Sequence, residues 1–230
     1  MIILHRALGM DGRIGMSYFT IKDESRAEFV EKKSTFIGHG KRVENEDDAK
    51  EFIQKVKGQH KEARHNVYAY IIGENKGIQR YSDDGEPQGT GGIPMLEVLK
   101  KNDITDVVVV VTRYFGGILL GTGGLARAYS KGASLAIKEA GVVEKVNGIA
   151  IEIVLEYDLL GKVQHLCTVE NFHIEDIEYT DKVKIKILCK LSDLEKLKLK
   201  ITEVTSGKAI FEEEDIKMYF KLEHRLYENS

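Results

Sequence analysis

The chain has 230 residues, enough for one large domain or two of ordinary size. Its composition, 42% hydrophobic and 31% charged with a formal net charge of −3, excludes fibrous and disordered proteins and is typical of a soluble globular protein. Since no stretch approaches the roughly eighteen apolar residues that a membrane helix needs, we expect no membrane partner.

The first fifteen residues show no clear pattern and lack the apolar core of a signal peptide. Met16 offers a second start, so we interpret residues 1–15 as a leader or an expression remnant. The two cysteines, Cys167 and Cys189, lie outside any Cys-x-x-Cys spacing, which favours reduced thiols over a disulfide or a zinc site. Together these features predict a cytoplasmic location.

Residues 16–143 are expected to form a first domain. It begins with three strand-like runs and a helix at about 46–58 that Gly58 ends. Two strands, a short helix "IPMLEVLKK", the continuously apolar strand "DVVVVVTRYF" and a long helix from Leu125 follow. This order predicts an α+β domain with its helices on one face of the sheet.

Residues 144–222 are expected to form a second domain with the order βαββαβ, the ferredoxin-like arrangement. Asp158 and Ser192 are the predicted N-caps of its two helices, with Glu195 in capping-box position after Ser192. The run "KAIFEEEDIKMYFKLE" is predicted to be one last strand, and residues 223–230 a tail.

Charge is unequally divided between the two predicted domains. Residues 16–145 carry 20 basic and 19 acidic side chains, whereas residues 146–230 carry 12 and 17. A protein that binds a phosphate backbone nonspecifically would show a basic stripe, so the second domain is a poor candidate for that role.

Two glycine clusters precede the predicted helices of the first domain: Gly89, Gly91 and Gly92, then Gly121, Gly123 and Gly124. Glycine allows a close backbone approach, and a helix start favours an anion. Arg113, Arg127 and Lys131 lie nearby in sequence, so this combination suits a phosphate group.

Named phosphate motifs fit poorly. Thr122 stands where a P-loop after Gly116 needs lysine. "GTGGLA" matches the dinucleotide fingerprint but lies far beyond its strand, in strand-rich surroundings.

An acidic group, Asp83, Asp84 and Glu86, stands between the strands and the first glycine cluster. Two interpretations stay open: the carboxylates cap a turn before Gly85, or they hold Mg²⁺ or transfer protons. For Arg113, an internal ion pair with these acids competes with ligand binding. No arrangement predicts a nucleophile or a resident cofactor.

Four segments carry a resemblance to a known family: "KKSTFIGH", "ARHNVYAY", "YSDDGEPQGTGGIPMLEVL" and "VVVVVTRYFGGILLGTGGLARAYSKGA". In this order and separation they resemble the YigZ/IMPACT family, over about residues 17–140. The resemblance implies an N-terminal domain similar to the second domain of ribosomal protein S5, and a ferredoxin-like domain similar to domain V of translocation factor G.

The resemblance also implies site residues and partners. The expected site is one cleft whose motif residues are His65, Asp83, Asp84, Glu86, Gly89, Arg113, Gly116, Gly117, Gly121, Gly123, Gly124 and Arg127. Arg64 departs from the family pattern, where a small or hydroxyl residue is common, and adds positive charge to the same cleft. Eukaryotic members regulate translation through an additional N-terminal RWD domain. This chain shows no such domain, so their partner in the starvation pathway is not carried over.

Three functions follow as hypotheses. The first, which we favour, is a translation-linked protein that binds the ribosome, RNA or a translation factor. The second is an enzyme for a phosphorylated small molecule, with Asp84 or Glu86 as the acid or base. The third is a protein–protein interaction module that docks through its acidic second domain.

Overall fold

A computed structural model describes residues 16–228 of the chain, so the predicted leader lies outside the described residues. The chain forms two compact units, one of Tyr18–Val143 and one from Glu144 onward. The division falls inside a strand, β7 (Val142–Leu155), rather than in a loop.

The N-terminal unit is built on an antiparallel sheet of five strands. In spatial order these are β2 (Ser25–Glu31), β3 (Ser34–Arg42), β6 (Val107–Tyr114), β4 (His65–Ile72) and β5 (Ile78–Ser82). A short strand, β1 (Tyr18–Ile21), adds a parallel bridge from Phe19 to Ile104. The buried strand β6 lies at the centre, as its continuous apolar character indicates.

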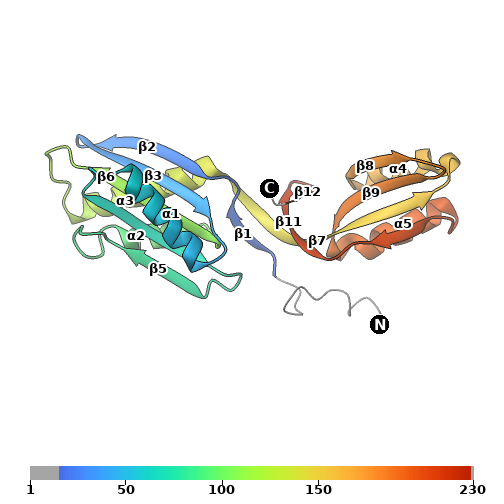
Figure 1. The fold of residues 1–230 in the computed structure, drawn as a ribbon, viewed down its shortest axis with the longest axis horizontal. Helices are drawn as coiled ribbons and strands as arrows, with labels where there is room; N and C mark the ends of the chain where they lie inside the picture. Colours follow the sequence, from blue (N-terminus) through green and yellow to red (C-terminus); the bar gives the residue numbers. More distant parts are fainter. Residues whose placement is uncertain (1–15, 229–230) are drawn as a thin grey trace. The chain divides into compact units, whose positions relative to one another are not determined.

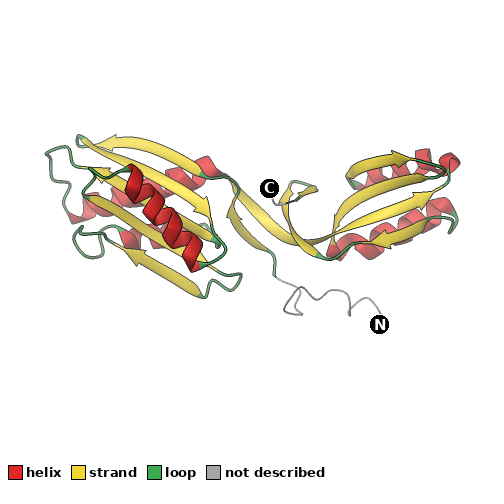
Figure 2. Cartoon of the chain, viewed as in Figure 1, coloured by secondary structure: helices red, strands yellow, loops and turns green. Residues whose placement is uncertain are grey.

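Helices cover both faces of this sheet (Figures 1 and 2). α2 (Gly92–Lys101) and α3 (Thr122–Ala140) pack on Val107, Val109 and Val111 of β6, while α1 (Glu46–Gln59) packs on Val108 and Val110. The expectation that the helices share one face is therefore wrong. Because residues 107–111 of β6 are all valine, its sequence does not show that alternate residues meet different helices.

Helix α1 is capped by an asparagine at its start and by His60 at its end. Asn45 caps its start by accepting from the backbone N–H groups of Asp47 and Asp48. Gly58 does not end the helix as predicted; α1 continues to Gln59, and His60 is its C-cap. An isolated glycine is tolerated within a helix when neighbouring residues pack well, as Phe52, Ile53 and Val56 do here.

The C-terminal unit has the ferredoxin-like order. β10 (Ile210–Glu213), β7, β9 (Val183–Lys190) and β8 (Ile174–Tyr179) pair antiparallel in that spatial sequence. α4 (Leu160–Glu170) and α5 (Leu194–Thr205) pack on one face, over Ile149, Ile151 and Ile153 of β7. The predicted α+β class and two-domain layout are confirmed.

The end of the chain differs from its prediction. The expected last strand is two strands, β10 and β11 (Lys217–Leu222), which pair with different parts of β7. Residues 225–227 are not a tail but a strand, β12 (Arg225–Tyr227), which forms a hairpin with β11. The run of four acidic residues, 212–215, begins inside β10, and only residues 214–216 separate β10 from β11.

Neither predicted cap forms in this unit. Short 3₁₀ turns at Tyr157–Leu159 and Leu191–Asp193 precede α4 and α5, so Asp158 and Ser192 lie inside these turns. The Ser192 hydroxyl donates to the Asp193 carboxylate instead of accepting from a helical N–H. The capping box with Glu195 is therefore wrong.

Candidate functional site

Asp83 organises the first glycine loop from within. Its carboxylate accepts from the backbone N–H groups of Gly89, Gly91 and Gly92, at 2.8–2.9 Å. Gly92 is the first residue of α2, so an internal carboxylate already occupies this helix start. The first glycine cluster is therefore satisfied by the protein itself and offers no free phosphate cradle.

Asp84 joins the loop to α1 and β4. Its two carboxylate oxygens accept from Lys57 Nζ at 2.7 Å and from the Asn66 N–H at 2.6 Å. The backbone of Asp84 takes the left-handed conformation (φ 44°), and its carbonyl lies 2.9 Å from His65 Nδ1. The carboxylate of Asp84 therefore joins the turn to α1 and β4 instead of capping the turn before Gly85.

Glu86 lies in the interior with two partners from distant elements. Its Oε1 accepts from Arg113 Nη1 at 2.7 Å and from the Tyr129 hydroxyl at 2.8 Å. The side chains of Glu86 and Arg113 are only 4% and 6% exposed. Burial and the adjacent Glu86 carboxylate raise the pKa of Tyr129 well above its usual range, so its hydroxyl remains a hydrogen-bond donor.

The three carboxylates thus point to three different sets of partners. Within residues 16–228, no three His, Cys, Asp or Glu side chains are grouped so that they could hold a metal ion. The arrangement gives the proposed Mg²⁺ site at Asp83, Asp84 and Glu86 no support. Both oxygens of Asp84 and Oε1 of Glu86 are bonded to protein groups, which leaves Oε2 of the buried Glu86 as the remaining carboxylate oxygen for acid–base chemistry.

The second glycine loop, residues 115–121, is exposed and differs from the first. Gly116 lies against the β2–β3 turn, where a Cβ would approach the Lys33 carbonyl oxygen to 1.9 Å. Gly121 has φ 72° and is the N-cap of α3. Gly117, Gly121 and Gly123 are exposed, and a Cβ at Gly123 would lie 3.7 Å from Arg127 Nη1.

The structure divides the predicted site into two sets of residues. His65, Asp83, Asp84, Glu86, Gly89 and Arg113 form an internally bonded set. Gly116, Gly117, Gly121, Gly123, Gly124 and Arg127 belong to the second glycine loop and the start of α3. Arg64 is exposed just before β4 and joins neither set by a recorded contact.

One cluster in this unit escaped the sequence analysis. His39 of β3 and His60 face each other with 3.1 Å between their Nε2 atoms, and His60 Nδ1 lies 2.9 Å from the Tyr114 hydroxyl. Nearby on the same face, the Thr112 hydroxyl donates to Asn66 Oδ1. Their separation along the chain and the lack of any ligand spacing explain why no sequence pattern indicated them.

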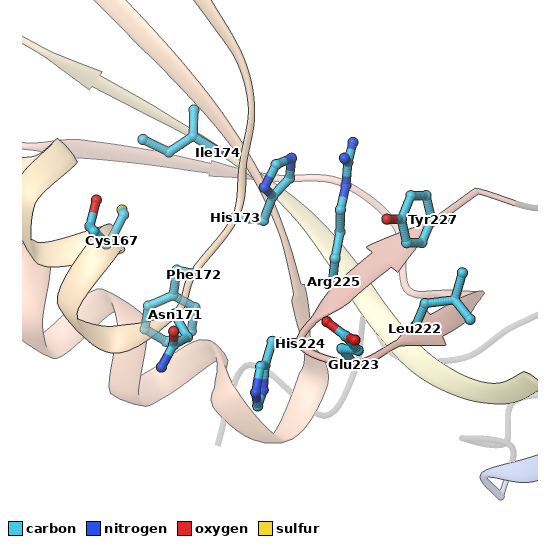
Figure 3. A pocket seen from close by; sticks show the side chains of 11 residues that line it. Cys167, Asn171, Phe172, His173, Ile174, Leu222, Glu223, His224, Arg225 and Tyr227 are labelled. Carbon is cyan, nitrogen blue, oxygen red and sulfur yellow. The ribbon is translucent and has the colours of Figure 1, made fainter.

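The C-terminal unit contains a groove that the sequence did not indicate either. Figure 3 shows it between the end of α4, the start of β8 and the β11–β12 hairpin, with a volume of about 760 Å³. His173, His224, Arg225 and Tyr227 contribute its polar groups. Arg225 Nη2 donates to both oxygens of Glu175 at 3.1 Å, so this cation is already paired.

Cys167 lines the same groove but is unsuited to nucleophilic chemistry. Burial raises the pKa of its thiol to about 11, which keeps it protonated near neutral pH. Cys189 is likewise buried, and its pKa is raised to about 12. Both cysteines are free, as a reduced chain requires.

Comparison with protein families adds an independent result. Residues 32–137 match the Impact N-terminal domain, and residues 153–208 match a domain of unknown function, DUF1949. These matches and the fold define a two-domain α+β protein with an Impact N-terminal domain.

Individual relatives lead to the same family. The chain is 44% identical over 200 residues to the IMPACT family member YvyE of Bacillus subtilis, covering 87% of this chain and 92% of that protein. It is 32% identical over 178 residues to YigZ of Escherichia coli, covering 76% and 87%. The chain therefore belongs to the IMPACT family.

More distant comparisons mark which part of the chain is shared widely. Protein IMPACT of Danio rerio is 38% identical over 97 residues, which cover 40% of this chain and 30% of that protein. A crystal structure of a hypothetical protein superimposes with a TM-score of 0.56 at 29% identity, over 85% of this chain and 96% of that one.

Among residues 16–228, no helix is both long and apolar enough to cross a bilayer.

Proposed function

We propose that this protein is a translation-linked regulator that binds ribosomal or other structured RNA through the N-terminal unit. The observation that carries the proposal is a group of exposed cations beside an exposed apolar loop. Regulation of translation by eukaryotic members, implied by the family resemblance, supports the same direction.

Sheet register brings three turns to one end of the N-terminal unit. Thr35 pairs with Tyr114, and His65 pairs with Arg113, so β3 and β4 both start where β6 ends. The β2–β3 turn, the segment before β4 and the second glycine loop therefore meet at this end. We call it the cationic loop end and define it by Lys32, Lys33, Arg64 and Arg127.

These four side chains are available to a partner. All four residues are exposed, and no ion pair joins them to another residue of the described part of the chain. The acidic residues of the neighbouring loop are occupied internally, so they do not neutralise these cations. Unpaired cations of this kind supply the electrostatic part of RNA binding.

The second glycine loop adds apolar surface to the same end. Phe115, Ile118 and Leu119 are 47%, 41% and 81% exposed. RNA-binding proteins stack unpaired bases on exposed aromatic rings and contact phosphates through cations and backbone N–H groups. Phe115, the glycine backbone and the four cations together offer these contacts.

The enzymatic alternative has less support. Asp84 and Glu86, its proposed acid or base, are both held by internal cations and N–H groups. A general acid or base needs to reach a substrate proton, whereas both Asp84 oxygens bond to protein groups and Glu86 is buried in an ion pair with Arg113.

The test is sedimentation of the protein with purified ribosomes at several salt concentrations. We expect co-migration that weakens steeply as salt rises. A variant with Lys32, Lys33, Arg64 and Arg127 changed to Gln should bind more weakly, and its log–log salt slope should fall by about three.

The matched control removes the same charge elsewhere in the unit. Lys22, Lys50, Lys101 and Lys138 are exposed and lie outside the cationic loop end, so their change to Gln should leave binding and slope near the unaltered values. Equal losses in both variants would show a nonspecific charge effect. Absence of sedimentation with ribosomes at low salt would contradict the proposal.

A further inference from the structure

His39 and His60 are arranged as a chelating pair. His39 is 7% exposed on β3, and His60 is half-buried at the C-terminus of α1. Their Nε2 atoms are 3.1 Å apart, and the rings are tilted by 53° with centroids 5.2 Å apart. The half-buried side of His60 leaves the pair open to solvent.

The separation of the two nitrogens fits shared metal coordination. Imidazole nitrogens bind Zn²⁺ at about 2.0–2.1 Å. Two such bonds put the nitrogens about 3.3 Å apart in tetrahedral geometry and about 2.9 Å apart at an octahedral right angle. The observed 3.1 Å lies between these values, so the two nitrogens have the spacing for a shared ion once both rings turn their lone pairs toward it.

Tyr114 orients one of the two rings. With His60 Nδ1–H donating to the Tyr114 hydroxyl at 2.9 Å, the His60 Nε2 lone pair faces His39. Metal-binding histidines characteristically donate their second ring nitrogen to such a partner. Without an ion, His39 Nε2–H donates to this lone pair; on metal binding, the His39 proton moves to Nδ1, and no net proton is lost.

The surroundings allow a cation to enter. Burial, the neighbouring ring and Arg26 lower the pKa of His39 to about 4, so its imidazole is neutral at physiological pH. Burial and Arg26 also lower the pKa of His60. Each nearby cation has an acidic partner, Arg26 with Glu28 and Lys55 with Glu24, which reduces its repulsion of a bound cation.

We propose that His39 and His60 bind one divalent transition-metal ion of the zinc class through their Nε2 atoms, with water completing its coordination. Imidazole ligands favour Zn²⁺, Cu²⁺ and Ni²⁺ over Mg²⁺ and Ca²⁺. Since no third protein ligand joins the pair within residues 16–228, the site is open and exchangeable rather than a closed structural site. The ion links β3 to the end of α1 and so stabilises the N-terminal unit.

Calorimetric titration of the metal-free full chain with ZnCl₂ tests this site. We expect the chain to bind one Zn²⁺ ion through the His39–His60 pair. Saturating Zn²⁺ should raise the melting temperature of the protein. His39→Gln and His60→Gln should each weaken this binding by about 100-fold, and Tyr114→Phe by about tenfold. The same titration with MgCl₂ should show no such binding.

His165→Gln is the matched control, because His165 is exposed on α4 and its loss removes an imidazole away from the pair. Circular dichroism without metal checks that each variant is folded. If the His39 variant does not fold, Tyr114→Phe still tests the site, because it keeps the aromatic ring and removes only the hydroxyl. Zn²⁺ binding that is unchanged in the pair variants, or absent from the unaltered protein, would overturn the proposal.

Discussion

Arg113 on β6 and Glu86 in the first glycine loop form a buried ion pair, with 2.7 Å between Nη1 and Oε1. The guanidinium is close to two aromatic rings, with its Cζ 5.6 Å from the centroid of Phe36 and 5.4 Å from that of Phe115. The pair connects the interior of the acidic loop to the strand that leads into the exposed second glycine loop.

Glu86→Gln should destabilise the N-terminal unit strongly. The change keeps the shape of the side chain but leaves the buried Arg113 charge uncompensated, which costs about 3–5 kcal/mol of unfolding free energy. Denaturant unfolding followed by circular dichroism measures the loss. Glu97→Gln, which breaks the exposed pair with Lys100, is the control and should cost under about 1 kcal/mol. Equal stability of the two variants would contradict a structural role for Glu86.

Asp83→Ala should loosen the first glycine loop. Three backbone N–H groups lose their common acceptor, at a cost of about 1–3 kcal/mol in unfolding free energy. Hydrogen exchange of Gly89, Gly91 and Gly92 should become faster, whereas Asp23→Ala at an exposed pair should leave these rates alone. If Asp83→Ala instead left the rates and the stability unchanged, the loop would be held by other contacts.

Two glycine-to-alanine changes should have opposite signs. Gly58 is helical with nothing within 4 Å of an added Cβ, so Gly58→Ala should stabilise the protein by about 0.5–1 kcal/mol. Gly132 is also helical, but a Cβ added to it would lie only 2.9 Å from Val111 Cγ1. The backbone is equally close to the sheet here, because a Cβ added to Gly38 would lie 2.5 Å from the Gly132 carbonyl oxygen. Gly132→Ala should therefore destabilise by about 1–3 kcal/mol. Thermal melting of both variants checks the contrast, and shifts of the same sign would contradict the close packing of α3 on the sheet.

The free energy of unfolding should decrease as the pH is lowered, because His39 resists protonation in the folded chain. Burial lowers the pKa of His39 in the folded chain from the ordinary 6.5 to about 4, and His60, Arg26 and Lys55 contribute to this shift. The Glu24 carboxylate acts in the opposite direction. The unfolded chain therefore binds the extra proton first, and stability present above about pH 6.5 is lost as the pH falls towards about 4. The loss approaches about 3 kcal/mol.

Urea unfolding between pH 7.5 and 4.5, with metal chelated, measures this dependence. His39→Gln should flatten the pH profile over that window, because glutamine does not titrate there. His165→Gln on exposed α4 should keep the slope of the unaltered protein. A profile that is equally steep with and without His39 would assign the pH dependence to other groups.

Some parts of the fold could be predicted because their signals are local. The alternation in "KVKIKILCKL" predicted β9, and the continuous run of valines predicted the buried strand β6. Gly92 and Gly121 stand at the starts of α2 and α3 as the glycine clusters indicated. Such signals depend on neighbouring residues and on the period of one element.

Other parts depended on long-range packing. The position of α1 on the second face of the sheet follows from Val108 and Val110, which carry no pattern different from Val107 and Val109. The division of residues 210–227 into three short strands depends on where β7 offers free edges. Residues 212–215 contain neither glycine nor proline, and Asp215 alone did not mark the break.

The sequence by itself determined the family, the α+β class, the two-domain order and the concentration of glycine and charge in residues 83–127. The family follows from the resemblance of four segments, and the other features follow from composition and local periodicity. Only the tertiary structure decided that Asp83, Asp84 and Glu86 turn to separate internal partners, while Lys32, Lys33, Arg64 and Arg127 stay exposed at one end. It also decided that His39 and His60, from different elements, face each other. The physical reason is that sheet register and helix docking, which join residues far apart in the chain, set which polar groups meet and which remain in water.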